Sequence, residues 1–83
     1  MFQIKLSNHA KKDLKKIDRI YLPKITQSIN SLSENPFLGE KMAGEYKGSY
    51  RIKIPPVRII YSVSLENKTI TIKAIGQRQG VYK

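Results

Sequence analysis

The sequence predicts an α+β domain of two layers, in which a helical hairpin packs on one face of an antiparallel meander sheet. Apolar and polar residues alternate near the N-terminus and again over residues 49–75, which is typical of half-buried strands. Between these stretches, apolar residues recur every three or four positions, as they do on the buried side of a helix. We therefore expect the element order β-α-α-β-β-β.

The length and composition bound the kinds of protein that the sequence can encode. The 83 residues are enough for one small domain, residues 1–83, and the absence of cysteine excludes disulfides and thiolate metal sites. No apolar run approaches the roughly 20 residues of a membrane span. The N-terminus lacks the pattern of a signal peptide. We expect a cytoplasmic protein with no membrane partner.

The first expected elements are a strand and a helix. Phe2, Ile4 and Leu6 alternate with polar residues and predict a short strand. Ser7 is a suitable N-cap for the helix that follows. The apolar positions of this helix, at the spacing i, i+4, i+7, are Ala10, Leu14 and Ile17. Its lysines are Lys11, Lys12, Lys15 and Lys16. These lysines fit a solvated helix surface, and they fit a non-specific electrostatic contact with RNA equally well.

A second helix is expected after a tight connection at residues 18–20, so that the two helices form an antiparallel hairpin. Its apolar residues, repeating at helical spacing, are Leu22, Ile25, Ile29 and Leu32. Pro23 lies in the first turn, where its missing N–H costs little. Asn35 and Pro36 provide a stop signal. Residues 37–48 are expected to form a connecting loop.

Residues 49–65 predict two strands joined at Pro55-Pro56. With the prolines at the tip, the expected pairs are Tyr50–Tyr61, Arg51–Ile60, Ile52–Ile59, Lys53–Arg58 and Ile54–Val57. The face that we expect to contact the core carries Tyr50, Ile52, Ile54, Val57, Ile59, Tyr61, Val63 and Leu65. Proline cannot adopt the positive φ of common two-residue hairpin loops. The tip is therefore either a type VI turn with Pro56 cis or a wider trans loop, which the rarity of cis bonds favours.

A last strand is expected after a turn at Glu66-Asn67. A two-residue loop would pair Val63 with Ile70, Tyr61 with Ile72 and Ile59 with Ala74. In this register, Lys73 and Ile75 face away from the core, and Ile75 lies beside Arg58.

The outward face of the predicted hairpin is basic. It carries Arg51, Lys53 and Arg58, with Lys53 directly opposite Arg58. Like charges in opposite positions destabilise a strand pair by roughly 0.2–1 kcal/mol, so folding alone does not favour this arrangement. We interpret it as an anion site, with phosphate the obvious candidate; a solvated basic face is the alternative. The formal charge of +10 points to a polyanionic partner, either nucleic acid or an acidic protein.

The candidate chemistry is cleavage of an RNA phosphodiester without a metal. One His and scattered acidic residues offer neither a metal site nor a catalytic carboxylate pair. The candidate catalytic residues are Arg51, Lys53, Arg58, Arg78 and Tyr82. The 2′-hydroxyl would attack the adjacent phosphorus, while the arginines stabilise charge on the phosphoryl oxygens. Lys53 would act as general base or electrostatic partner, and Tyr82 would stack on a base or orient the hydroxyl. Further RNA contacts are expected from Lys11, Lys12, Lys15, Lys16 and Lys73.

Three blocks of the sequence resemble the RelE/ParE toxin superfamily. They are Gly-Ser-Tyr-Arg-Ile-Lys-Ile at 48–54, Arg-Ile-Ile-Tyr at 58–61, and the segment 75–82 with its Ile-Gly-Gln-Arg and Val-Tyr. The order of elements resembles the superfamily along almost the whole chain. The catalytic residues that this resemblance implies are Arg51, Lys53, Arg58, Arg78 and Tyr82. Gln77 departs from the His or Lys that many relatives carry.

The resemblance implies a toxin of a type II toxin–antitoxin pair. RelE-like members cleave mRNA in the ribosomal A site without a metal, whereas ParE-like members inhibit DNA gyrase. The basic set favours the RelE-like branch, with the ribosome and mRNA as partners and no cofactor. A gyrase inhibitor and a basic binding domain without catalysis are the alternatives. We expect an acidic antitoxin segment to cover the basic face and a groove beside the helices.

Overall fold

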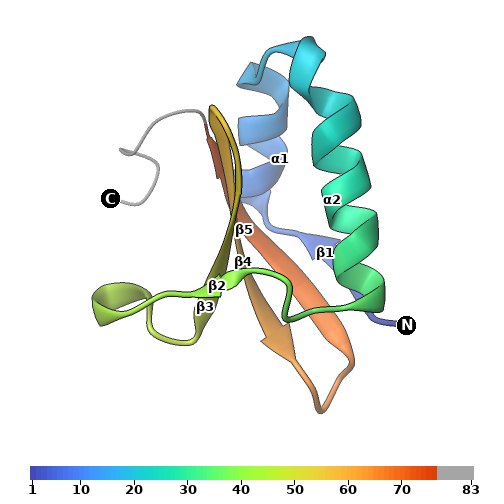
Figure 1. Cartoon of the computed structure of the whole chain (residues 1–83), viewed down its shortest axis with the longest axis vertical. Coiled ribbons are helices and arrows are strands. Elements are labelled where there is room, and N and C mark those ends of the chain that lie inside the picture. Colours follow the sequence, from blue (N-terminus) through green and yellow to red (C-terminus); the bar gives the residue numbers. More distant parts are fainter. Residues whose placement is uncertain (77–83) are drawn as a thin grey trace.

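The computed structural model describes residues 1–76 and has the two layers expected from the sequence (Figure 1). Two α-helices cover one face of a sheet, and the opposite face points away from both. The elements are β1 (Gln3–Leu6), α1 (Asn8–Lys16), η1 (Arg19–Tyr21), α2 (Leu22–Glu34), β2 (Glu40–Lys41), η2 (Gly44–Tyr46), β3 (Ser49–Ile54), β4 (Val57–Ser64) and β5 (Thr69–Gly76), where η marks short 3₁₀ turns. The predicted α+β class is therefore confirmed.

The sheet has five strands in the order β1-β5-β4-β3-β2. Strands β3, β4 and β5 form the expected antiparallel meander, but β1 pairs in parallel with β5, from Gln3 opposite Thr69 to Leu6 opposite Ile72. The expectation of a purely antiparallel sheet is therefore wrong. The chain leaves β1 through the helical hairpin and re-enters the sheet at the far edge, in the two-residue strand β2. This route leaves β1 to pair with the last strand. Strand β2 lies within the predicted loop and was not expected.

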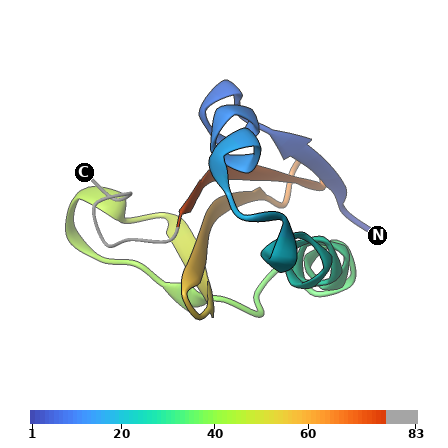
Figure 2. The ribbon, with the colours of Figure 1, turned by 90° about the horizontal axis from the view of Figure 1, so that it is seen from above.

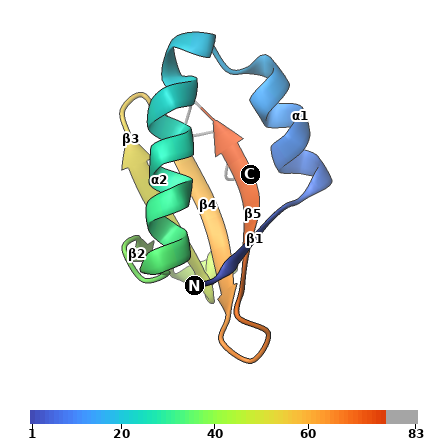
Figure 3. The same ribbon diagram turned by 90° about the vertical axis from the view of Figure 1, so that its right-hand side faces the viewer.

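The start of α1 and the end of α2 lie at the residues predicted for them. Ser7 is the N-cap of α1, and its hydroxyl accepts a hydrogen bond from the N–H of Ala10 at 3.0 Å. Pro23 lies in the first turn of α2, and Asn35 is its C-cap. Figures 2 and 3 show the two helices side by side over the same face of the sheet. The predicted apolar positions that are buried are Ala10, Ile17, Ile25 and Leu32, and those packed around them are Leu14, Leu22 and Ile29.

The β3–β4 hairpin has the predicted register throughout. The pairs run from Tyr50 opposite Tyr61 to Ile54 opposite Val57, and they include Lys53 opposite Arg58. The peptide bond between Pro55 and Pro56 is cis. The pair next to the tip, Ile54 with Val57, is present in the ladder, so the expectation of a wider trans loop is wrong.

The β4–β5 pairing departs from the prediction beyond Tyr61. Val63 pairs with Ile70 and Tyr61 with Ile72, as expected, but Ile60 then pairs with Ala74. Lys73 is thus an extra residue in β5, which makes a β-bulge. The bulge shifts the rest of the strand by one residue, so that Ile75 pairs with Ile59 and Gly76 with Arg58. The predicted pair of Ile59 with Ala74 is therefore wrong.

Two predicted side-chain directions also need correction. Ile75 is 1% exposed and belongs to the core, because the bulge reverses the faces of the residues that follow it. Leu65, placed on the core face in the prediction, is 64% exposed. The last β4–β5 pair is Ser64 with Thr69, which leaves a four-residue turn instead of two. In this turn Lys68 takes a left-handed φ of 49°, and Leu65 lies outside the ladder.

Tyr61 connects the sheet to the loop that follows α2. Its ring is fully buried, and its hydroxyl donates to the Pro36 carbonyl at 2.9 Å while accepting from the N–H of Gly39 at 2.9 Å. Burial raises the pKa of Tyr61, partly opposed by the Gly39 hydrogen bond. A Cβ at residue 39 would lie 2.6 Å from the Tyr61 hydroxyl oxygen and 2.8 Å from the Arg51 carbonyl oxygen, so only glycine fits. This contact fixes where β2 begins.

Candidate functional site

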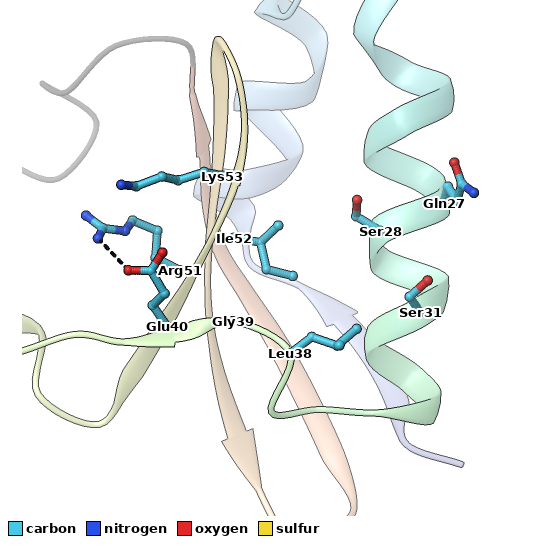
Figure 4. Close-up of a pocket in the computed structure, with 9 residues that line it drawn as sticks. All are labelled: Gln27, Ser28, Ser31, Leu38, Gly39, Glu40, Arg51, Ile52 and Lys53. Carbon is cyan, nitrogen blue, oxygen red and sulfur yellow. Dashed lines mark hydrogen bonds and ion pairs between the residues drawn. The ribbon is translucent and has the colours of Figure 1, made fainter.

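The basic residues of the β3–β4 hairpin lie on the face of the sheet away from the helices. Arg51, Lys53 and Arg58 share this face because Lys53 pairs with Arg58 and side chains alternate along β3. Figure 4 shows Arg51 and Lys53 extending away from α2, whereas Ile52 between them points toward it. Lys53 is exposed, and both arginines are half-buried. The three cations therefore lie together on one hairpin, as expected from their parity, whereas Arg78, which we also expected in this patch, lies outside the described residues.

Lys73 adds a fourth cation to this surface. Its ammonium group donates a hydrogen bond to the hydroxyl of Ser49 at 2.9 Å. Ser49 is 2% exposed and has the same parity on β3 as Arg51, so the lysine chain reaches across β4 on the side of the basic residues. We refer to Arg51, Lys53, Arg58 and Lys73 as the basic face.

Glu40 pairs with Arg51 and was not anticipated from the sequence. The two residues are directly opposite on β2 and β3, and the Arg51 guanidinium donates to the Glu40 carboxylate at 3.2 Å (Figure 4). The Glu40 side chain is 65% exposed and that of Arg51 27% exposed. The carboxylate offsets part of the positive charge at one end of the basic face. Prediction missed Glu40 because a two-residue strand shows no periodicity.

A groove of about 400 Å³ lies between α2 and β3. Its lining residues, drawn in Figure 4, are Gln27, Ser28, Ser31, Leu38, Gly39, Glu40, Arg51, Ile52 and Lys53. Strand β2 pairs only with Tyr50 and Arg51, so within residues 1–76 the outer edge of β3 from Ile52 to Ile54 has no strand partner. The groove and this edge together could accommodate an extended chain beside Arg51 and Lys53.

The lysines of α1 form a separate surface. Lys11, Lys12, Lys15 and Lys16 are all exposed, but α1 covers the face of the sheet opposite to the basic face (Figure 1). The fold does not bring these predicted RNA-binding residues together with Arg51, Lys53 and Arg58. A phosphate held on the basic face would therefore not touch them.

The predicted site residues Arg78 and Tyr82 lie outside the described residues, as does Gln77. Gly76, the last described residue, is paired with Arg58, so the described part of β5 reaches the backbone of a candidate catalytic residue.

Metal ligands do not gather in the part of the chain that the structure describes. No group of three or more His, Cys, Asp or Glu residues there could hold a metal ion. His9 contacts the carboxylate of Asp13 at 3.0 Å, four residues along α1. Within residues 1–76, neither helix has the length and apolar character needed to cross a membrane.

Comparison with known proteins gives consistent matches over nearly the full length. A family model described as the ParE toxin of the type II toxin–antitoxin system parDE matches residues 4–82. RelE1 of Methanocaldococcus jannaschii is 34% identical over 86 residues, an alignment that covers 99% of this chain and 96% of the relative.

The fold is also similar to solved structures. The isolated RelE toxin of Escherichia coli superposes with a TM-score of 0.82 at 21% identity, covering 99% of this chain and 92% of that one. A chain of the toxin–antitoxin complex RelBE2 from Mycobacterium tuberculosis superposes with a TM-score of 0.82 at 23% identity, covering 93% of this chain and 98% of that one. At sequence identities of 21% and 23%, these superpositions establish similarity of fold alone.

Proposed function

The chain belongs to the RelE/ParE superfamily of toxins of type II toxin–antitoxin systems, and from this premise we propose that it is a ribosome-dependent endoribonuclease that cleaves mRNA in the A site. The observation that carries the proposal is the presence of Arg51, Lys53 and Arg58 on one face of one hairpin. Three cations held in register offer preorganised charge to a phosphodiester. The reaction would take place in the cytoplasm, where the ribosome holds the mRNA.

The proposed reaction uses the RNA itself as the nucleophile. The 2′-oxygen forms a bond to the adjacent phosphorus, the bond from phosphorus to the 5′-oxygen breaks, and the departing 5′-oxygen takes a proton from water. The products are a 2′,3′-cyclic phosphate and a 5′-hydroxyl. Arg51 and Arg58 stabilise the charge that develops on the phosphoryl oxygens. Lys53 takes the proton of the 2′-hydroxyl or acts as an electrostatic partner. Arg78 adds positive charge, and Tyr82 stacks on a base or orients the 2′-hydroxyl. No metal is required by this scheme.

The decisive experiment is cleavage of mRNA on programmed ribosomes. Purified toxin is added to ribosomes stalled with a defined codon in the A site, and the mRNA is mapped by primer extension. We expect cleavage at the A-site codon, and none of the same mRNA without ribosomes. Intact mRNA on the ribosome, with toxin that is folded by circular dichroism, would contradict the proposal.

Inhibition of DNA gyrase is the second candidate function. It is favoured by the family model, whose description names the ParE toxin. A gyrase inhibitor needs a binding surface and no set of convergent catalytic cations. A supercoiling assay separates the two: a RelE-like toxin leaves gyrase active at concentrations that cleave mRNA, whereas a ParE-like toxin blocks supercoiling and leaves mRNA intact.

A type II toxin has a cognate antitoxin, and the surface of this chain indicates how one could bind. Besides the basic face, a groove of about 450 Å³ lies along α1 and α2. Its lining, mostly apolar, consists of Leu6, Leu14, Lys15, Leu22, Ile25, Thr26, Ile29 and Asn30. We propose that an acidic antitoxin segment buries this groove and covers the basic face, so that apolar burial and charge neutralisation act together.

A further inference from the structure

The edge of β5 is longer than the strand that pairs with it. Strand β1 ends at Leu6, opposite Ile72, while β5 continues to Gly76. Beyond Leu6, Ser7 supplies the next hydrogen bonds to β5. Its N–H donates to the Ile72 carbonyl at 3.0 Å, and its hydroxyl donates to the Lys73 carbonyl at 2.9 Å. Side-chain and backbone groups at the start of α1 thus replace the missing strand along this edge.

Asp13 supplies the next hydrogen bond along the same edge of β5. One of its carboxylate oxygens accepts a hydrogen bond from the N–H of Ile75 at 2.9 Å, and the same oxygen contacts the His9 ring at 3.0 Å. The Asp13 side chain is only 17% exposed, although it stands in a lysine-rich helix whose other charged residues are in solvent. A hydrogen bond from a backbone N–H to a carboxylate is stronger than one to a neutral acceptor. Asp13 therefore holds the end of β5 against α1.

The residue that Asp13 holds lies next to the basic face. Ile75 is paired with Ile59, and the next residue, Gly76, is paired with Arg58. These pairs exist only because the bulge at Lys73 has shifted the register of the last part of β5. Within residues 1–76, that shifted part pairs with β4 on one side and is bonded by Asp13 on the other, while Ser7 bonds Lys73 at the bulge itself.

We propose that Asp13 is a positioning residue for Arg58, acting through the end of β5. The carboxylate keeps Ile75 in the shifted register, Ile75 places Gly76 beside Arg58, and Arg58 is thereby held in line with Lys53 on the basic face. Asp13 itself does not touch the substrate. The catalytic consequence rests on the proposed ribonuclease function, whereas the effect on the strand end does not.

The experiment compares three variants of the full chain. Asp13→Ala removes the acceptor for the Ile75 N–H. Asp13→Asn keeps an oxygen acceptor of the same shape without the charge, and His9→Ala removes only the neighbouring ring. Amide hydrogen exchange at Ile75 and the chemical shifts of Arg58 and Gly76 are measured by NMR. Cleavage of ribosome-bound mRNA and RNA affinity are measured well below the melting temperature of each variant.

We expect Asp13→Ala to accelerate exchange at Ile75 by at least about tenfold, because its N–H loses its acceptor, and to shift the Arg58 and Gly76 signals. Its cleavage rate at saturating ribosome concentration should fall by about tenfold or more, with RNA affinity little changed. Asp13→Asn should restore both properties most of the way, and His9→Ala should resemble the wild type. A merely structural role would lower the melting temperature of Asp13→Ala without changing turnover of the folded protein.

Two results would overturn the inference. One is unchanged exchange at Ile75 and unchanged Arg58 and Gly76 signals in folded Asp13→Ala. The other is wild-type turnover by that variant despite a released strand end. If the wild-type protein does not cleave mRNA, the proposed function fails, and the NMR comparison alone still decides whether Asp13 positions the strand end at Arg58.

Discussion

Glu40 and Arg51 face each other across β2 and β3, and their side chains are joined at 3.2 Å. The pair places a carboxylate at the edge of an otherwise cationic surface, where a phosphate would have to compete for the same guanidinium. Arg51 lines the groove beside β3 together with Lys53. The charge balance at this edge is therefore set by a residue outside the predicted catalytic set.

The first prediction concerns this pair. Glu40→Gln keeps the shape of the side chain and removes its charge, so Arg51 should bind a phosphate more readily. Because an exposed ion pair contributes little, we expect RNA affinity to increase by no more than about fivefold, with the gain shrinking at high salt. Filter binding to a short RNA measures this. Glu66→Gln, an equal charge change at the exposed β4–β5 turn, serves as the control, and an equal gain there would mean that only net charge matters.

The second prediction concerns catalysis on the basic face. Arg58→Ala should reduce cleavage of ribosome-bound mRNA by about a hundredfold or more, since one preorganised donor to a developing anion is typically worth that much. Arg58→Lys should recover part of the loss, because a lysine keeps the charge without the planar fork. Lys12→Ala, which removes an exposed cation from α1, the helix on the opposite face of the sheet, should cleave at the wild-type rate. Equal losses of cleavage rate in Lys12→Ala and Arg58→Ala would show that the cations act only through non-specific electrostatic attraction.

The third prediction concerns Tyr61 and alkaline pH. Burial raises the pKa of this phenol in the folded protein, so the unfolded chain loses the proton first. The stabilising contribution is complete below the unfolded pKa of about 10 and is lost as pH rises from there through the folded pKa. Tyr61→Phe should cost about 1–3 kcal/mol at neutral pH, because the Gly39 N–H loses its acceptor. The stability difference from the wild type, measured by urea unfolding, should narrow above pH 10; a constant difference would argue against the raised pKa.

The sequence was most informative where one face of a strand pair is wholly apolar. A slip of β3 by one residue relative to β4 would have exposed Ile52 and Ile54 and turned Arg51 and Lys53 toward the core. The pairing of Lys53 with Arg58 could therefore be predicted from alternation alone. The amphipathic helices were predictable for the same reason, since each has one apolar stripe and a capping residue.

The incorrect predictions share one physical cause, because each concerns a feature that tertiary contacts determine. In Thr71-Ile72-Lys73-Ala74-Ile75 both parities contain apolar residues, so alternation cannot reveal the bulge at Lys73. The parallel pairing of β1 depends on the path through the helices, and β2 depends on the contact of Gly39 with Tyr61. In the sequence, Asp13 is one more charged residue in a helix rich in lysine. Its isolation among lysines was the only sequence signal of a different role.

The fourth prediction tests the packing of α2 on the sheet. Leu32 is fully buried in the core cluster, and its truncation to Ala should reduce the free energy of unfolding by about 2–5 kcal/mol. Leu65→Ala removes the same atoms from a side chain that is 64% exposed, so its effect should stay within about 0.5 kcal/mol. Urea denaturation of both variants measures the contrast. Equal losses of unfolding free energy would show that the exposed fractions of these two leucines do not predict the cost of truncating them.

The last prediction concerns the antitoxin. With a formal charge of +10, the toxin should bind an acidic antitoxin segment with an affinity that falls as salt rises, by at least about tenfold between low and high ionic strength. Leu14→Gln, in the groove along α1 and α2, should weaken binding by a similar factor at every salt concentration, because it removes apolar burial and leaves the charges unchanged. Arg58→Gln should instead flatten the salt dependence. Calorimetric titrations of the purified pair at several salt concentrations measure both effects. An affinity that is independent of salt would leave the apolar groove as the principal contact and exclude an electrostatic role for the basic face.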